Sequence, residues 1–398
     1  MSAKPIYAMG VDAGSDRTRA VICLLEQGRL RLLGYGEAAA EGWLQSRIAD
    51  QKAVAASILA ARREAERVAQ GRVGSAVLGT GGSTICCGTG KGGYEAGYSR
   101  EFNQHDLTRV IERASHVRFL EDEMLLHLCV QDFSVDGRRG HRDPRGTFGS
   151  HLKAYVSLVT FSIQEHHLLV GAANLAELMV EETVFEPLAA AYACLKPEQR
   201  REGIAVIDIG AESTDLVVYY GDALVLASSL RLAGANFTRD VAKKLGLSFE
   251  EAEAVKIQHG CAMVGLTADT SVIEVPTPAG RQRREMPRDE LNFVLEARAE
   301  QLFKYVRREL ARVQMQDKLM GGVVLCGGTA RLNGMCDVAE FVLKCPASWG
   351  LPVGIQDWPP ALEDPAWATA AGLAMYSARL KQREMDGGSR GLIDKVLG

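Results

Sequence analysis

Several kinds of segment that would decide the class of this chain are missing from it. No stretch approaches the roughly 18 consecutive apolar residues of a membrane-spanning helix. The opening residues, MSAKP, do not resemble the apolar core of a secretion signal. The nine cysteines are an odd number without a C-x-x-C pair, and several lie inside apolar runs, so they indicate reduced, buried thiols. We therefore expect a soluble, cytoplasmic body.

A large excess of charge of one sign is also missing. Lys and Arg number 46 against 50 Asp and Glu, so the net charge is −4, and nothing here predicts general attraction to nucleic acid. Hydrophobic residues make up 47% and charged residues 24%, which is typical of globular proteins. A chain of 398 residues is long enough for two hydrophobic cores, or for one bilobed body with a cleft.

Three common nucleotide and metal motifs are absent. Gly90-Lys91 is followed by glycine and lacks the first glycine of a Walker A loop. No G-x-G-x-x-G opens a βαβ unit at the N-terminus, which argues against dinucleotide binding. Glu165-His166-His167 does not have the spacing of the zinc motif H-E-x-x-H.

What the sequence does contain is a repeated unit. Apolar runs at 6–12 and 19–25 flank a glycine turn, and a third follows near 30–34. The same strand–turn–strand–strand pattern recurs about 195 residues later, which a diverged internal duplication explains. Two similar α/β lobes would then face each other across a cleft. Helices are expected at 46–70, 186–195, 237–245, 249–259, 288–318, 333–344 and 366–380.

The segment 84–165 interrupts this rhythm. A helix at 105–115 and strands at 128–135 and 151–161 surround a polar loop at 136–150. We interpret it as a small inserted α+β subdomain.

Each repeat carries a loop suited to phosphate. In the first, Asp12 ends a strand and Gly14, Ser15, Asp16 and Arg17 form the turn. Glycine lets backbone amides approach an anion, Ser15 adds a hydroxyl and Arg17 offsets phosphate charge. Asp12 is placed to hold water bound to Mg²⁺.

The second loop repeats this arrangement. Asp208 corresponds to Asp12 and is followed by a turn that includes Gly210, Ala211, Glu212, Ser213 and Thr214. A Glu212 carboxylate near phosphate would be repulsive unless it points away or helps to hold the metal.

Two further motifs suit the nucleoside. A buried strand ends at Gly327-Gly328-Thr329, where backbone without side chains could lie against a purine and its α-phosphate. Glu253 and Lys256 share one helix face and could bind ribose hydroxyls, although a surface ion pair is the simpler interpretation.

In this order, the motifs resemble the actin-like ATPase superfamily, with Phe185–Ala191 and Thr369–Leu373 similar to its two connecting helices. Within it, the run AEAVKIQHGCA at 252–262 and the run QDFSVD at 131–136 are similar to FtsA proteins. The resemblance implies a bilobed actin-like (ribonuclease H-like) α/β fold with an interlobe nucleotide cleft. It assigns the ranges as follows: subdomain 1A at 1–83, 166–195 and 362–385; 1C at 84–165; 2A at 196–231 and 321–361; 2B at 232–320; and a tail at 386–398.

The resemblance also implies function. It predicts ATP and Mg²⁺ in the cleft, with Asp12 and Asp208 near the metal through water and Glu186 as a water-positioning acid; whether hydrolysis is efficient stays open. It predicts filaments of this chain, binding of the FtsZ C-terminal tail through 2B and contacts with other division proteins. The expected location is the cytoplasmic face of the cell membrane at the division septum.

The tail is the predicted membrane contact. Its four large apolar residues, Leu392, Ile393, Val396 and Leu397, could anchor the chain reversibly, and filament avidity would strengthen the attachment. A frayed terminus is the alternative for this segment. The alternatives for the whole chain are a PilM-like adaptor that binds a peptide of a pilus membrane protein, and a small-molecule kinase on the same fold.

Overall fold

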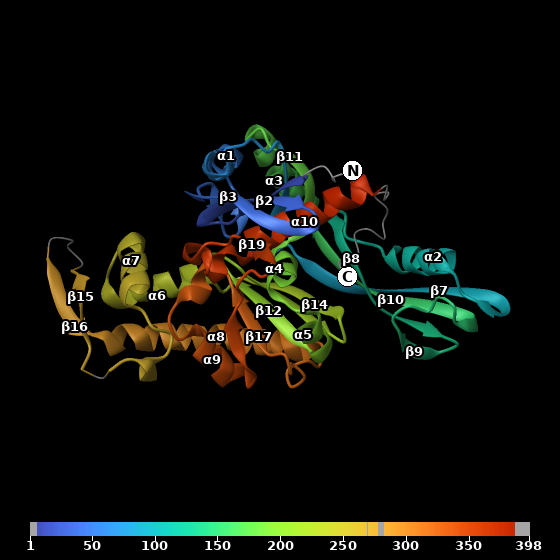
Figure 1. Cartoon of the computed structure of the whole chain (residues 1–398). Helices are drawn as coiled ribbons and strands as arrows, with labels where there is room; N and C mark the ends of the chain where they lie inside the picture. Colours follow the sequence, from blue (N-terminus) through green and yellow to red (C-terminus); the bar gives the residue numbers. More distant parts are fainter. Residues whose placement is uncertain (1–5, 269, 278–281, 387–398) are drawn as a thin grey trace.

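The computed structural model of the chain describes residues 6–268, 270–277 and 282–386. The first lobe is built on a six-stranded sheet (Figure 1). Its order is β11 (Met179–Phe185), β6 (Ser75–Thr80), β1 (Ile6–Ala13), β2 (Arg17–Glu26), β3 (Arg29–Ala39) and β19 (Ile355–Gln356). Helices α1 (Gln51–Ala69) and α3 (Ile163–Leu175) share a core cluster with β1 and β6.

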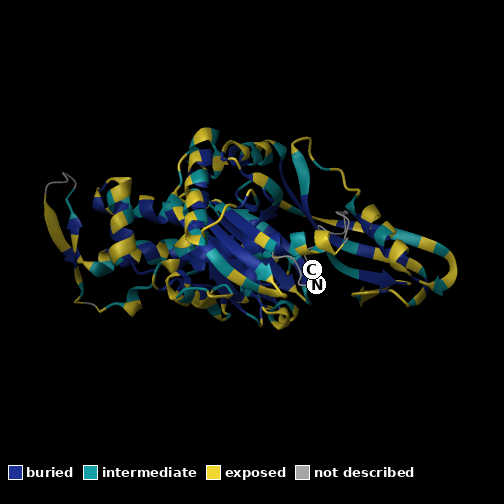
Figure 2. Ribbon diagram, turned by 45° about the horizontal axis from the view of Figure 1, so that its top comes forward, coloured by how far each residue is buried: buried dark blue, intermediate teal, exposed yellow. Residues whose placement is uncertain are grey.

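The second lobe repeats this sheet. Its order is β14 (Ala223–Leu230), β13 (Thr214–Tyr220), β12 (Ile204–Ile209), β17 (Val323–Cys326) and β18 (Ala347–Trp349). In the first lobe β1 pairs antiparallel with β2 and parallel with β6. In the second lobe β12 pairs in the same way with β13 and with β17. Taken from β18 to β14, the second sheet has the strand order of the first sheet from β11 to β3, which confirms the predicted repeat of the strand–turn–strand–strand unit. Figure 2 shows buried residues concentrated in the sheets at the middle of the molecule.

Two helices connect the lobes. α4 (Glu186–Cys194) leads from β11 of the first lobe towards β12 of the second, with a short α5 (Pro197–Glu202) between. α10 (Ala368–Met385) follows the second lobe and packs on β1 and α4. At their crossing a β-carbon on Gly372 would clash with the backbone of Ala189, so only glycine allows this approach.

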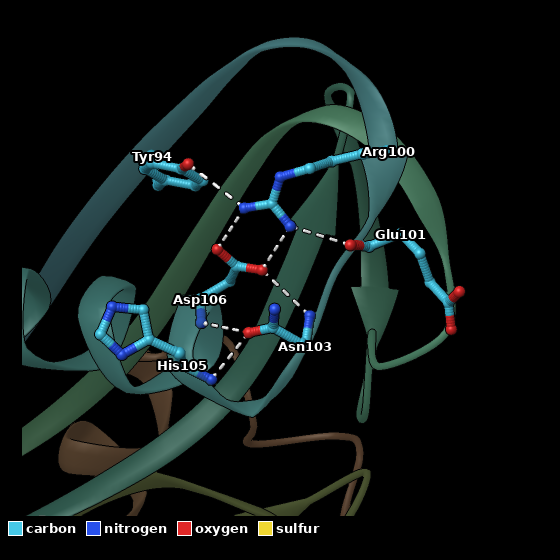
Figure 3. Close-up of polar contacts among 6 residues, drawn as sticks. All are labelled: Tyr94, Arg100, Glu101, Asn103, His105 and Asp106. Carbon is cyan, nitrogen blue, oxygen red and sulfur yellow. Dashed lines mark hydrogen bonds and ion pairs between the residues drawn. The ribbon is translucent and has the colours of Figure 1, made fainter.

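The inserted unit extends from one end of the body (Figure 1, right). Its sheet has the order β7 (Cys86–Glu101), β10 (Phe148–Ser162), β8 (Glu123–Val135) and β9 (Arg138–His141), and α2 (Gln104–Ser115) covers one face. Asn103 caps α2, while Arg100 forms two hydrogen bonds with Asp106, at 2.8 and 2.6 Å (Figure 3). Arg100 also donates to the hydroxyl of Tyr94, so these contacts fasten the helix to β7.

The opposite end belongs to the second lobe (Figure 1, left). It contains α6 (Gly234–Leu245), α7 (Phe249–His259), the hairpin of β15 (Val272–Pro276) and β16 (Arg283–Pro287), and the long α8 (Arg288–Arg312). Helix α9 (Met335–Leu343) packs on α8 nearer the sheet.

Several predicted boundaries were wrong. The helix expected at 46–70 begins at Gln51, capped by Asp50, and a small hairpin of β4 (Trp43–Leu44) and β5 (Arg47–Ile48) precedes it. The helix expected at 288–318 ends at Arg312. Strand β7 was not predicted, and neither was the hairpin of β15 and β16.

Candidate functional site

Two carboxylates stand at equivalent places in the two lobes. Asp12 lies near the end of β1 and Asp208 near the end of β12. Burial, together with the charge of Asp208, raises the pKa of Asp12 to about 7. Burial also raises the pKa of Asp208. The hydroxyl of Thr369, in the first turn of α10, donates a 2.6 Å hydrogen bond to Asp208, which acts to lower that pKa. The structure therefore brings the two predicted metal-site residues together.

Glu186 and Asp215 complete the acidic cluster. A β-carbon on Gly81 would lie 2.7 Å from a carboxylate oxygen of each, so the two groups meet there. Burial and the charges of Asp12, Asp215 and Asp208 raise the pKa of Glu186 well above its ordinary value. Burial raises the pKa of Asp215 to about 6.

Asp215 was not singled out as a site residue. It accepts hydrogen bonds from the Ser213 hydroxyl at 3.0 Å and from the backbone amide of Gly82, in the first lobe, at 3.2 Å. The hairpin pattern could have indicated Asp215, because this residue on β13 pairs with Asp208 on β12.

Arg19 was also not predicted as a site residue. It is buried on β2 opposite Asp12, and its charge lowers the pKa values of Asp12 and Asp208. Its Nε lies 2.8 Å from Glu37. Arg17, the cation that the sequence favoured, is half exposed beside Glu37 and Asp16, at 3.8 and 3.7 Å.

Residues of both lobes line a cavity next to the carboxylates. The first phosphate loop contributes Gly14 and Ser15, and the second contributes Ser213. The remaining lining residues come from the first lobe and its junction with the inserted unit: Ala13, Trp43, Ser46, Ile48, Gly79, Thr80, Gly81, Gly82, Thr84, Phe161, Glu165, Leu169 and Glu186. Asp16 does not line the cavity and is exposed.

Hydrogen bonds from neighbouring segments hold the second phosphate loop in place. The carbonyl of Gly210 accepts hydrogen bonds from the Thr329 hydroxyl at 2.8 Å and from the amide of Gly234 at 3.0 Å. Ala211 accepts from the amide of Ala235, while the Thr214 hydroxyl donates to the carbonyl of Leu232. The loop is therefore held by the third motif and by the start of α6.

The two glycines of the third motif have different surroundings. Gly327 has φ of 85°, and a β-carbon there would clash with the side chain of Asp208. Nothing lies within 4 Å of a β-carbon placed on Gly328. This second glycine therefore leaves an open backbone surface of the kind expected next to a purine.

Glu253 and Lys256 form the predicted pair on one helix face, 2.7 Å apart. Lys256 is buried and donates to the hydroxyl of Thr238 at 2.9 Å, and that hydroxyl also donates to Glu253. The Nζ of Lys256 lies 3.4 Å from the carbonyl of Gly234. The pair thus joins α7 to the start of α6, the same segment that supports Gly210.

The carboxylate oxygens of the cluster are groups that could hold Mg²⁺ through the ion's own water molecules. Among the residues that the structure describes, no three His, Cys, Asp or Glu side chains gather closely enough to bind a metal directly. Mg²⁺ prefers oxygen ligands and keeps several of its waters, and buried carboxylates provide such an environment.

The predicted membrane residues Leu392, Ile393, Val396 and Leu397 lie outside the described residues. No helix within the described part of the chain is long and apolar enough to cross a membrane.

Two family models match this chain, one in the inserted unit and one over most of the second lobe and the start of α10. Residues 205–372 match the family "Cell division protein FtsA", and residues 82–160 match "SHS2 domain inserted in FTSA". The chain is 30% identical over 380 residues to the cell division protein FtsA of Pseudomonas aeruginosa, covering 95% of this chain and 90% of that protein. It is 29% identical to FtsA of Escherichia coli strain K12, covering 92% and 89%, and 29% identical to FtsA of Bacillus subtilis, covering 93% and 83%.

Solved structures agree on the fold. A PilM-PilN type IV pilus biogenesis complex matches with a TM-score of 0.63 at 18% identity, covering 94% of this chain and 98% of that one. MreB 5 of Spiroplasma citri bound to AMPPNP matches with a TM-score of 0.57 at 13% identity, covering 97% and 100%. These likenesses, with the inserted unit, confirm the predicted actin-like fold.

Proposed function

Because this chain belongs to the FtsA family of actin-like cell-division proteins, we propose that it is an ATP-binding, self-polymerising adaptor that tethers FtsZ filaments to the inner face of the cell membrane. The kinship supports the division role, since it extends over 380 residues. One structural observation supports nucleotide binding above all: Asp12 and Asp208, from equivalent loops of two lobes, belong to one carboxylate cluster, and Glu186 of that cluster lines the cavity.

ATP would lie between the two phosphate loops. Backbone amides at Gly14 and Ser15 would face the phosphates, and the open backbone at Gly328 would face the base. Asp12 and Asp208 would hold Mg²⁺ through its waters, and the ion would offset the charge of the carboxylates and phosphates together.

Turnover is proposed to be slow. Glu186 lines the cavity and is half-buried, with a pKa raised by burial and by its acidic neighbours. Burial and these neighbouring charges favour the protonated carboxyl over the ionised one, and a protonated carboxyl is a poor acceptor for the proton of an attacking water. The cleft is thus better suited to retaining ATP than to hydrolysing it quickly.

The FtsZ tail is proposed to bind at the far end of the second lobe. Two large apolar side chains are exposed there, Ile257 on α7 at 72% and Phe293 on α8 at 63%. Arg288 of α8 donates to the carbonyl of His259 of α7, which joins the two helices at that place. Exposed apolar side chains on a rigid support are suitable anchors for a short peptide.

Peptide titration tests the partner assignment. With Mg²⁺ and ATP present, we expect saturable binding of an FtsZ C-terminal peptide, weakened at least tenfold by Ile257→Ser together with Phe293→Ser. The matched control is Tyr98→Ser, which removes an exposed aromatic group from the inserted unit. Binding of a PilN-like peptide without binding of the FtsZ peptide would contradict the proposal and favour the PilM-like alternative.

A further inference from the structure

One side chain of the second phosphate loop crosses the cleft. The Glu212 carboxylate accepts a 2.6 Å hydrogen bond from the backbone amide of Ser46, which belongs to the first lobe. The carboxylate of Glu212 therefore points towards the opposite lobe. It binds a backbone amide directly, as an anion does.

The amide that Glu212 binds lies at the tip of the β4–β5 hairpin. Gln45 and Ser46 form the turn with φ of 53° and 60°, a left-handed conformation that presents their backbone outward. Glu165 holds the base of the hairpin, through the amide of Ile48 at 3.4 Å and through Arg47 at 3.9 Å. The hairpin is therefore anchored at its base, whereas its tip reaches the second lobe.

The tip closes over the place proposed for phosphate. Ser46 lines the same cavity as Gly14, Ser15 and Ser213. A carboxylate and a phosphate group both seek backbone amides, and they repel each other where the environment is poorly hydrated. Glu212 and the terminal phosphates of a nucleotide would therefore compete for one small region between the lobes.

We propose that Glu212 is a built-in latch, which closes the β4–β5 hairpin on the second lobe through Ser46 and which the phosphates of an incoming nucleotide must open. The inference rests on the proposed binding of ATP between these loops. When phosphates enter, the carboxylate leaves Ser46 and the hairpin tip is released. The cleft then reports nucleotide occupancy through the position of one hairpin.

The rest of the interlobe contact does not depend on this latch. Asp215 accepts from the amide of Gly82, and α4 packs on α10. Removing the Glu212 side chain should therefore free the hairpin tip without separating the lobes. This makes a direct test on the full-length protein possible.

The test combines hydrogen exchange at the Ser46 amide with binding titrations of ATP-Mg²⁺ and of adenosine. In Glu212→Ala without nucleotide, the Ser46 amide should exchange at least tenfold faster than in the wild type. Glu212→Gln, which keeps an acceptor oxygen but loses the charge, should show intermediate exchange. The control is Glu26→Gln, an exposed carboxylate at the end of β2, which should change neither rate nor affinity.

Affinity supplies the second readout. Both Glu212 variants should bind ATP about tenfold more tightly than the wild type, whereas adenosine, which carries no phosphate, should bind all of them equally. In the wild type, ATP should accelerate exchange at Ser46. Unchanged exchange at Ser46 in Glu212→Ala would overturn the latch, and weaker ATP binding would show instead that Glu212 supports the ligand. If the wild type binds neither ATP nor adenosine, the proposed nucleotide function fails, and phosphate-driven opening fails with it.

Discussion

The acidic cluster makes the ligand-free cleft sensitive to pH. Burial and mutual repulsion raise the pKa values of Asp12 to about 7 and of Asp215 to about 6. The folded protein therefore retains protons that the unfolded chain has released. The free energy of unfolding should fall as pH rises from about 4 towards 7, because the unfolded state then ionises more readily than the folded one.

Replacing Asp12 by Asn should reverse part of this loss. The melting temperature should rise relative to the wild type at pH 8, where Asp12 is ionised, and should differ little at pH 4, where it is protonated. The same variant should lose the dependence of ATP binding on Mg²⁺. Calorimetry at the two pH values and ATP titrations with and without Mg²⁺ measure these effects.

The matched control is Asp317→Asn, which neutralises an exposed carboxylate and should change neither quantity. An Asp12→Asn protein that is less stable than the wild type at pH 8 would contradict the repulsive cluster.

At the scale of elements, the inserted unit explains one failure of prediction. Strand β7 begins CCGTGKGG and does not show the alternation of apolar residues on which strand prediction depends. Its buried face is made of glycine, because a β-carbon on Gly90 or Gly92 would clash with the backbone of α2 at Ala114 or Val110. Its partner β10 and the next strand of the sheet, β8, carry ordinary apolar side chains, and both were predicted.

The attachment of α2 should be sensitive to one carboxylate. Asp106 accepts from Arg100 and from the amide of Asn103, and Arg100 holds the pKa of Asp106 below its usual range. Because this pKa is depressed, the stabilising effect is present near neutral pH and is lost as pH falls through the folded-state value. Asp106→Ala should cost about 1–3 kcal/mol, because Arg100 loses its ion-pair partner and the amide of Asn103 loses its acceptor.

Limited proteolysis measures this effect, since cleavage within 84–165 should become faster at pH 7.5. Glu112→Ala, an exposed acid on the same helix, is the control. Equal protection of both variants would show that the contacts in Figure 3 do not hold the helix.

The crossing of α4 and α10 provides a second test at this scale. Gly372→Ala places a methyl group against the backbone of Ala189, so the two connecting helices must move apart. We expect a loss of about 1–3 kcal/mol in stability and weaker ATP binding, because Thr369 on the same helix supports Asp208. Gly88→Ala, with nothing within 4 Å of its β-carbon, should change neither denaturation nor ATP titration; equal behaviour of the two variants would contradict a tight crossing.

At the scale of the whole molecule, the sequence predicted what is local and repeated. Asp12 and Asp208 each follow a buried strand and precede a turn, so both loops and the duplication could be recognised from nearby residues. Arg19 and Asp215 face Asp12 and Asp208 from the next strand of each hairpin, so recognising them requires the strand register. The Ser46–Glu212 contact depends on distant segments of the two lobes meeting. The pattern of any single segment does not contain such information, and two-residue strands such as β4 and β5 leave almost no periodic signal.

The proposed membrane role also belongs to the whole molecule. A short apolar tail would bind a bilayer weakly and reversibly, whereas a filament that carries many tails would bind far more tightly. Nucleotide, polymer and membrane are therefore expected to act together. Loss of any one of them should release the protein from the membrane.

The most direct measurement is pelleting with anionic liposomes, with and without ATP-Mg²⁺, of the full-length chain and of a truncation after Asp386. The truncation keeps α10, Ala368–Met385, complete. The account predicts ATP-dependent pelleting of the full-length protein with liposomes, and its loss in the truncation. Absence of pelleting in every condition, or equal pelleting of the truncated protein with liposomes, would contradict the tethering role.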